Sequence, residues 1–233
     1  MADSKLTELE KLKDKPEEIH SNPFEEFPNA LIFLIAGVSG VGKSTAVRAI
    51  VRMEVAGRIV VFIVTHTNRQ PRNNSEVGME VHGVNYFFVS TDEFIRLRSI
   101  GYFAESEEVY QNRFYGTSFN QLYNVASSYG FGITDIDVRG AKALKALFPN
   151  NVYTIFMKPE SKEQAIQQLR LRANAENVAE AEIEARVKRF EYEFSEAVHF
   201  DEEVVSIAGN PNCAAVSILT IMEREIEKRF PKK

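Results

Sequence analysis

The stretch Gly37-Val38-Ser39-Gly40-Val41-Gly42-Lys43-Ser44-Thr45 follows an apolar segment at 30–36 and matches the phosphate-binding pattern GxxxxGK[ST] at every specified position. Its first and last glycines allow a tight turn whose backbone N–H groups point at an anion, and Lys43 adds a mobile positive charge. The apolar segment is typical of a parallel strand buried on both faces, and residues 45–55 can form the following helix. The stretch therefore predicts a loop that binds a nucleoside triphosphate, with Ser44 as a ligand of the accompanying magnesium ion.

Length and composition indicate a globular protein. The 233 residues suffice for one domain with elaborations, and 44% of them are hydrophobic and 26% charged. No apolar run is long enough to cross a bilayer, and residues 1–28 form an acidic extension unlike a secretory or transit peptide. This extension carries much of the net charge of -5, and the near-neutral remainder gives no support for a nucleic-acid surface. We therefore expect a cytoplasmic protein without nucleic-acid or membrane partners, either a monomer or a homodimer.

Strand and helix patterns alternate along most of the chain beyond the loop. Apolar runs lie at 59–64, 131–136, 152–157 and 204–207, and helical patterns at 139–147, 161–172, 179–197 and 214–230. Asn212 is the predicted N-cap of the last helix. This alternation predicts an α/β fold with a parallel sheet. We expect a core formed by residues 29–67 and 131–233, interrupted by a small mixed insert at 68–130 that contains a helix at 91–100.

A second group of polar residues lies in and beside this insert. Thr65, Arg69, Arg72, Tyr86 and Tyr115 together offer two guanidinium groups and three hydroxyls, which suit a phosphate dianion. The two arginines follow the C-terminal end of a predicted sheet strand, where ligands of open α/β sheets bind. Taken singly, each arginine is more typical of a solvated surface and each tyrosine of a packed interior. As a group they predict a site for a second phosphate.

Five segments, in chain order, resemble signatures of the guanylate kinase family. They are Thr65–Arg72 (a hydroxyl residue, then TTRxPR), Glu80–Ser90 (EVxGxDYxFVS), Phe103–Glu105 (FxE), Asn112–Thr117 (NYYGT) and Asp135–Gly140 (DIDVQG). The resemblance implies a P-loop NTPase fold, with a three-layer parallel sheet core, a small mixed α/β insert that binds GMP, and a helical lid at about 170–186. It also implies transfer of the terminal phosphoryl group of ATP, with Mg²⁺, to GMP or dGMP.

The resemblance further implies how the acceptor nucleotide binds. The five residues of the second-phosphate group would hold the phosphate of GMP, while Glu105 and Thr117 would read the base. The chemistry is consistent, because a carboxylate at Glu105 accepts from both the ring N–H and the amino group of guanine, and the Thr117 hydroxyl can donate to the 6-oxo group. Adenine presents a ring acceptor to the same carboxylate, so we expect Glu105 to dominate the choice of base.

Two further sets of residues have open interpretations. The resemblance places Asp135 beside the acceptor and, with Ser44, in the magnesium shell; capping of the next helix is the alternative for Asp135 and Asp137. Arg172 and Arg186 match lid arginines that, with Lys43 and Arg69, would neutralise charge on the transferred group. The alternative for the lid arginines is a set of helix-face salt bridges, to Glu176, Glu182 or Glu184.

The chain also departs from the family pattern at His66, Asn68 and Arg113, and its 72–80 connection is longer than the family's usual loop. Asn210 is only a displaced candidate for the residue that contacts adenine. Two other functions stay open: a same-fold kinase that acts on ribose 1,5-bisphosphate, and a noncatalytic guanylate-kinase-like module that binds phosphopeptides. The guanine-reading residues count against the first of these, and the complete phosphate loop counts against the second.

Overall fold

The computed structural model describes residues 21–51, 53–74, 78–128, 130–175, 179–207 and 210–231, with the side chains of 74, 172–175 and 211 excepted. Five parallel strands form its central sheet, in the order β13-β12-β1-β11-β4. They are β1 (Leu31–Gly37), β4 (Val61–Phe62), β11 (Phe131–Asp135), β12 (Val152–Pro159) and β13 (Glu202–Ser206). Every residue of β1 is buried, because the central strand of the sheet is covered on both faces.

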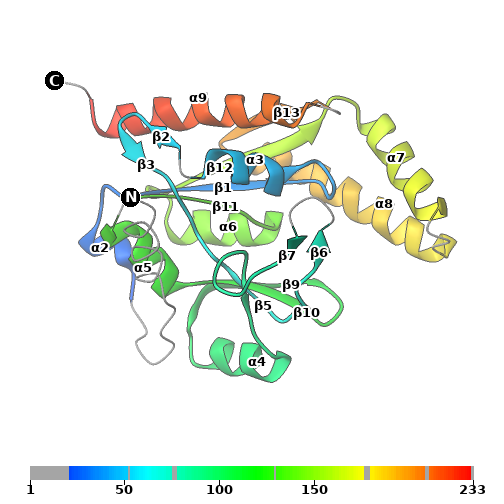
Figure 1. Cartoon of the computed structure of the whole chain (residues 1–233), viewed down its shortest axis with the longest axis horizontal. Helices are drawn as coiled ribbons and strands as arrows, with labels where there is room; N and C mark the ends of the chain where they lie inside the picture. Colours follow the sequence, from blue (N-terminus) through cyan, green and yellow to red (C-terminus); the bar gives the residue numbers. More distant parts are fainter. Residues whose placement is uncertain are drawn as a thin grey trace.

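Alternate residues of β1 enter two separate hydrophobic cores. Leu31, Phe33 and Ile35 pack with α3 (Lys43–Ile50) and α9 (Pro211–Arg229), whereas Ile32 and Leu34 pack with α5 (Phe119–Ser128) and α6 (Val138–Leu147). The short helix α2 (Pro23–Glu26) joins the second core through Phe24. Figure 1 shows α3 and α9 on one side of the sheet and α6 on the other. The three-layer α/β core expected from the sequence is therefore present.

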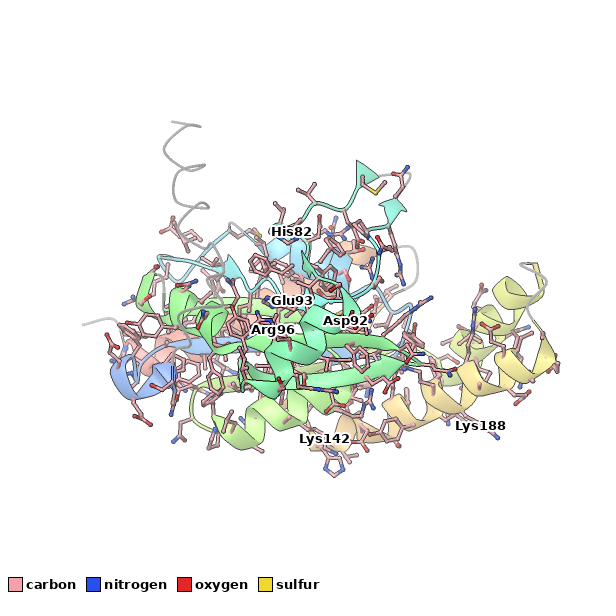
Figure 2. All side chains as sticks on the ribbon, turned by 90° about the horizontal axis from the view of Figure 1, so that it is seen from below. His82, Asp92, Glu93, Arg96, Lys142 and Lys188 are labelled. Atoms are coloured by element: carbon pink, nitrogen blue, oxygen red, sulfur yellow. The ribbon has the colours of Figure 1, made fainter. Side chains whose placement is uncertain are left out.

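A second sheet carries the segments between β4 and α5. Its order is β8-β5-β10-β9, formed by β5 (His66–Thr67), β8 (Phe87–Phe88), β9 (Phe103–Tyr110) and β10 (Arg113–Ser118). The helix α4 (Thr91–Ser99) lies on the outer side of this sheet, and Figure 2 shows Glu93 and Arg96 on its solvent face. A small antiparallel ribbon, β6 (Asn73–Asn74) with β7 (Gly78–Met79), precedes β8. The second sheet thus begins at His66, two residues before the expected boundary of the insert.

The segment predicted as a lid, at about 170–186, falls on a pair of helices. Helix α7 (Lys162–Ala175) packs against α8 (Glu180–Ser195), and Arg170 joins them through an ion pair to Glu184 at 2.7 Å. The pair projects from one end of the molecule (Figure 1). Helix α8 then ends in a 3-10 turn, Glu196–His199, rather than running to residue 197. Among the helices within the described ranges, none has both the length and the apolar character of a membrane span.

Three boundaries predicted from the sequence are wrong. Helix α3 ends at Ile50 instead of 55, because the chain turns at Ala56 and Gly57, both with positive φ, and forms the hairpin of β2 (Glu54–Val55) and β3 (Arg58–Ile59). That hairpin also shortens the strand predicted at 59–64. The last helix begins at Pro211 with Asn210, not Asn212, in the N-cap position, since proline is well suited to the first helical position.

Candidate active site

The phosphate loop leaves β1 through a glycine that no other residue can replace. A Cβ atom on Gly37 would lie 2.1 Å from the carbonyl oxygen of Met157, on the neighbouring strand β12, and Gly37 has a φ of 146°. The Lys43 ammonium folds back over the loop and donates to the carbonyl oxygens of Gly37 (2.8 Å) and Val38 (2.9 Å). Burial lowers the pKa of Lys43, and the carboxylates of Glu193 and Asp135 oppose that shift. The lysine thus lies over the loop without a direct ion pair in the described chain.

The end of β11 brings a carboxylate to the same loop. Parallel pairing sets Asp135 beside Ile35, and its Oδ2 accepts a hydrogen bond of 2.6 Å from the Ser44 hydroxyl. A hydroxyl and a carboxylate are hard oxygen ligands, and Mg²⁺ sites in nucleotide kinases commonly use one or two such groups together with substrate phosphates. No cluster of three or more metal-binding His, Cys, Asp or Glu side chains occurs within the described part of the chain. The donor set fits a magnesium ion that arrives with a nucleotide.

Two side chains on neighbouring strands of the second sheet, Glu105 and Thr117, form a buried polar pair. Thr117 of β10 pairs with Glu105 of β9, and its hydroxyl donates to Glu105 Oε1 at 2.6 Å. Burial raises the pKa of Glu105 to about 7, against the opposing effect of the Thr117 hydrogen bond. Gly140 of α6 leaves room for the carboxylate, since a Cβ atom there would lie 2.7 Å from Oε2. The pair can therefore offer a carboxylate and a hydroxyl to one flat polar ligand.

One cavity of about 160 Å³ joins the loop to this pair. Its walls include Lys43 and Asp135 from the core, and four residues of the second-sheet region that were predicted for the acceptor: Thr65, Tyr86, Glu105 and Tyr115. The predicted Thr117 is buried beside Glu105 and does not line this cavity. Burial raises the pKa of Tyr86, so its phenol stays protonated and can donate a hydrogen bond. A larger cavity of about 1510 Å³ lies on the other side of Ser39 to Gly42, between the loop and the helical pair. Four arginines line the larger cavity: Arg72, Arg113, Arg186 and Arg189.

Arg69 is held by a carboxylate instead of facing the smaller cavity. Its guanidinium donates two hydrogen bonds to Glu80, at 2.5 and 2.9 Å, and lies 5.1 Å from the centre of the Tyr86 ring. Glu80 also accepts from the backbone N–H of Arg72 at 2.7 Å. Although burial acts in the opposite direction, these hydrogen bonds lower the pKa of Glu80. The two predicted phosphate-binding arginines are thus arranged around one anionic side chain.

Two of the departures from the family pattern, Asn68 and His66, have structural roles outside the cavities, whereas a third, Arg113, lines the larger cavity. The Asn68 amide donates to the Thr91 hydroxyl (2.8 Å) and the Asn112 carbonyl (2.9 Å), which ties α4 to the hairpin of β9 and β10. His66 is buried and stacks on Phe87, with ring centres 4.9 Å apart. Neither side chain is among those that line the two cavities.

Two of the alternative interpretations, helix capping and helix-face ion pairing, are visible in the structure. Asp137 caps α6 by accepting from the Arg139 backbone N–H at 3.0 Å, so the capping interpretation is confirmed for Asp137. Arg186 forms the helix-face ion pair with Glu182, at 2.8 Å, while also lining the larger cavity. Arg172 belongs to α7, but its side chain lies outside the described part of the chain.

Two residues of α8 that the sequence reasoning missed lie at the centre of the site. Glu193, 5% exposed, accepts from the Ser39 backbone N–H at 2.9 Å through Oε2 and from Arg189 Nε at 2.8 Å through Oε1. The spacing of these two residues matches that of an ordinary surface ion pair on a helix, which hides their position. The sequence feature that could have revealed their position is Phe190, an aromatic residue between them that is buried in the second core. It indicates that this face of α8 turns inward.

The sheet topology, the phosphate loop and the lysine over it define an α/β protein of the P-loop NTPase class. The family model for guanylate kinase matches residues 29–213. A guanylate kinase of Bacteroides fragilis is 33% identical over 76% of this chain and 81% of the relative, and one of Geobacter metallireducens is 33% identical over 83% and 96%. The chain belongs to the guanylate kinase family.

A solved structure supports the same fold. The crystal structure of guanylate kinase from Anaplasma phagocytophilum superposes with a TM-score of 0.63, at 24% identity, over 88% of this chain and 97% of that one.

Proposed function

We infer that the chain transfers the terminal phosphoryl group of ATP to GMP, giving ADP and GDP, as its family membership indicates. The observation that carries this inference is Glu105, which accepts a hydrogen bond from the buried Thr117 hydroxyl and lines a cavity that Lys43 also lines. A carboxylate suited to guanine and a lysine suited to a triphosphate in one cavity support an acceptor nucleotide that binds opposite a phosphoryl donor.

Recognition of the base follows from hydrogen-bond complementarity. Ionised Glu105 would accept from the ring N–H and the amino group of guanine. The Thr117 hydroxyl, which donates to Glu105 in this structure, would turn to donate to the 6-oxo group. Adenine would direct a ring nitrogen acceptor at the carboxylate. Leaving a buried carboxylate without donors costs free energy, so AMP should bind poorly.

We propose that the GMP phosphate binds among the hydroxyls of Thr65, Tyr86 and Tyr115, next to Arg69 and Arg72. The hydroxyls line the smaller cavity, and the ring of Tyr86 lies against the Arg69 guanidinium. Two fixed positive charges there would hold the GMP dianion close to the terminal phosphate of ATP in spite of their mutual repulsion. The reaction needs no general base, because the attacking phosphate oxygen is already ionised near neutral pH.

On the donor side, the N–H groups of residues 37–45 would bind the ATP phosphates, with Lys43 on the terminal ones. Ser44 and Asp135 would hold Mg²⁺, which supplies positive charge to the phosphate oxygens when it is bound with ATP. Arg172 and Arg186 are proposed to approach the phosphates when the helical pair closes over the larger cavity. Closure would also exclude water, the competing acceptor.

The test is turnover of a panel of acceptors with ATP and Mg²⁺, measured as ADP release: GMP, dGMP, AMP, UMP and ribose 1,5-bisphosphate. We expect GMP and dGMP to be phosphorylated with a kcat/KM at least about 10²-fold above that of AMP. Equal rates for GMP and AMP, or turnover of the ribose bisphosphate alone, would contradict the proposal. A protein without turnover that binds a phosphopeptide would instead support the noncatalytic function. The cytoplasmic location and the monomeric or dimeric state stay predictions.

A further inference from the structure

Arg189 of α8 lies where the two cavities meet. Among the described residues it is the one cation that lines both the smaller, acceptor-side cavity and the larger, lid-side cavity. The second cation of the smaller cavity is Lys43. An arginine in this position faces both the donor and the acceptor sides of the reaction.

Contacts to three different parts of the molecule hold the Arg189 guanidinium in place. Its Nη2 donates to Asp137 Oδ2 of the core at 2.8 Å, and its Nη1 donates to the Val109 carbonyl of β9. The guanidinium carbon also lies 4.2 Å from the centre of the Tyr110 ring. Together with the Nε bond to Glu193, these hydrogen bonds engage one N–H group on each nitrogen. Among the described residues, two of the five N–H groups of the arginine therefore stay available for a further anion.

The Glu193 carboxylate lies where such an anion would bind. The same carboxylate accepts from Arg189 and from the Ser39 backbone N–H, one of the loop groups that bind phosphate oxygens in this class. Lys43 binds the carbonyl oxygens of Gly37 and Val38, the two residues before Ser39. The lysine and the Ser39 N–H therefore lie at the same end of the loop. Because the lysine of this motif binds the terminal phosphates, we expect those phosphates at this end.

We propose that Arg189 is a further catalytic residue, which contacts the phosphoryl group during its transfer, and that Glu193 takes the place of that group in the unliganded chain. The proposal rests on the phosphoryl-transfer function proposed above. When ATP binds, a phosphate oxygen would replace Glu193 on the Ser39 N–H and would meet Arg189 there. As the bond to the ADP oxygen breaks and the bond to the GMP oxygen forms, Arg189 would donate hydrogen bonds to the oxygens of the transferred group without giving up a proton.

The competing explanation is that Arg189 only braces α8 against β9 and Asp137. A brace would affect stability and substrate binding, whereas a catalytic arginine lowers the energy of the transition state specifically. The two roles are separated by comparing kcat with KM, and by the affinity for a complex that imitates the transferred group, ADP with aluminium fluoride and GMP.

We would compare Arg189→Ala and Arg189→Lys with Arg224→Ala, a matched control that removes an exposed, ion-paired arginine of α9 that lines neither cavity. For Arg189→Ala we expect kcat to fall about 10²- to 10³-fold, with a similar loss of affinity for the aluminium fluoride complex and less than about threefold change for ATP. Guanidinium ion in the assay should restore part of the lost rate. Arg189→Lys should keep the fold and recover little, because an ammonium cannot form the same fork of hydrogen bonds.

Glu193→Gln tests the second half of the proposal. The neutral amide competes less well than a carboxylate for the Ser39 N–H, so the Kd for ATP should fall; a higher Kd would overturn the role given to Glu193. A kcat within fivefold of wild type in Arg189→Ala, or a loss confined to KM and thermal stability without rescue by guanidinium, would overturn the role of Arg189 alone. A wild-type protein without GMP turnover would overturn the proposed function as well.

Discussion

Lys43 on the donor side and Arg69 on the acceptor side are both cations proposed to hold phosphate, but they are held differently. Lys43 donates to two neutral carbonyl oxygens of its own loop, whereas Arg69 donates twice to the carboxylate of Glu80. The donor site is thus built from backbone geometry, which nine consecutive residues determine. The acceptor site is built from charged side chains of separate segments, so its affinity and selectivity can be changed one residue at a time.

The largest effect should come from the donor side. Lys43→Ala removes a charge that stabilises the transferred phosphoryl group and has no replacement in the loop, so kcat should fall about 10³-fold or more. The Kd for GMP, measured by calorimetry, should change little, because the acceptor is held by other residues. Lys228→Ala, which removes an exposed lysine of α9 paired with Glu225, is the matched control and should retain full activity. Equal losses in the two variants would contradict the assignment.

The second-largest effect should come from Glu105, the residue proposed to recognise the guanine base. Glu105→Gln places an amide where both guanine donors need an acceptor, so kcat/KM for GMP should fall about 10²-fold or more, while the low value for AMP should not fall in parallel. Glu108→Gln changes an exposed carboxylate of the same strand and should leave the GMP preference intact. Steady-state rates with GMP and AMP check both variants. An unchanged preference in Glu105→Gln would show that another residue reads the base.

The pKa of Glu105, raised to about 7 by burial, predicts a pH dependence on the acceptor side. GMP requires the ionised carboxylate, so its affinity should rise with pH up to about 7, by at most about tenfold per unit, and then level off. Stability should show the opposite trend. A raised carboxyl pKa stabilises the unliganded fold at low pH, and this contribution, on the order of 3 kcal/mol, is lost as the pH rises from 4.5 to about 7.

Calorimetry with GMP at pH 6 to 8, together with unfolding curves from pH 5 to 8, would measure both trends. Glu105→Gln should remove both, and at pH 8 its unliganded form should unfold at a higher temperature than the wild type. A GMP affinity that stays flat between pH 6 and 8 would argue against an ionised Glu105 as the acceptor of guanine.

The smallest effect should come from removing the negative charge of Glu80, which holds Arg69 in position. Glu80→Gln weakens the two hydrogen bonds from Arg69, so KM for GMP should rise about tenfold with little change in kcat. Because this change affects the phosphate and not the base, KM for AMP should rise by the same factor, which distinguishes it from Glu105→Gln. Glu93→Gln, at an exposed ion pair on α4, serves as the control and should leave both KM values unchanged. A rise confined to GMP would refute a role for Glu80 on the phosphate side.

The parts that sequence predicts well are local ones. The strand, loop and helix from residue 31 to 50 follow from consecutive residues, because apolar pattern and glycine spacing act over a few positions. The end of α3 could not be predicted, since it depends on a turn with Ala56 in a left-handed conformation, which alanine rarely adopts. A shared role of Glu105 and Thr117 at the base was expected only through the family resemblance, and the hydrogen bond between them was not predicted.

Contacts between distant segments account for what the sequence did not reveal. Glu193 meets Ser39 across 154 positions of the chain, and Arg189 meets Val109 across 80, so no window along the sequence contains either contact. Asn68 was read as a departure near the acceptor phosphate, but it joins α4 to the β9–β10 hairpin. In each case the residue type is ordinary and only its place in the fold gives it a role.

The narrow space between Gly140 and Glu105 has a consequence for the order of events in catalysis. Glu105 belongs to the second sheet, but the wall that confines its carboxylate is a helix of the core, where a single methyl group would collide with it. If Glu105 recognises guanine as proposed, the base site would be complete only while the two parts are in contact. Recognition of the base and contact between the second sheet and the core would then occur together. A nucleotide with the wrong base would dissociate before phosphoryl transfer begins.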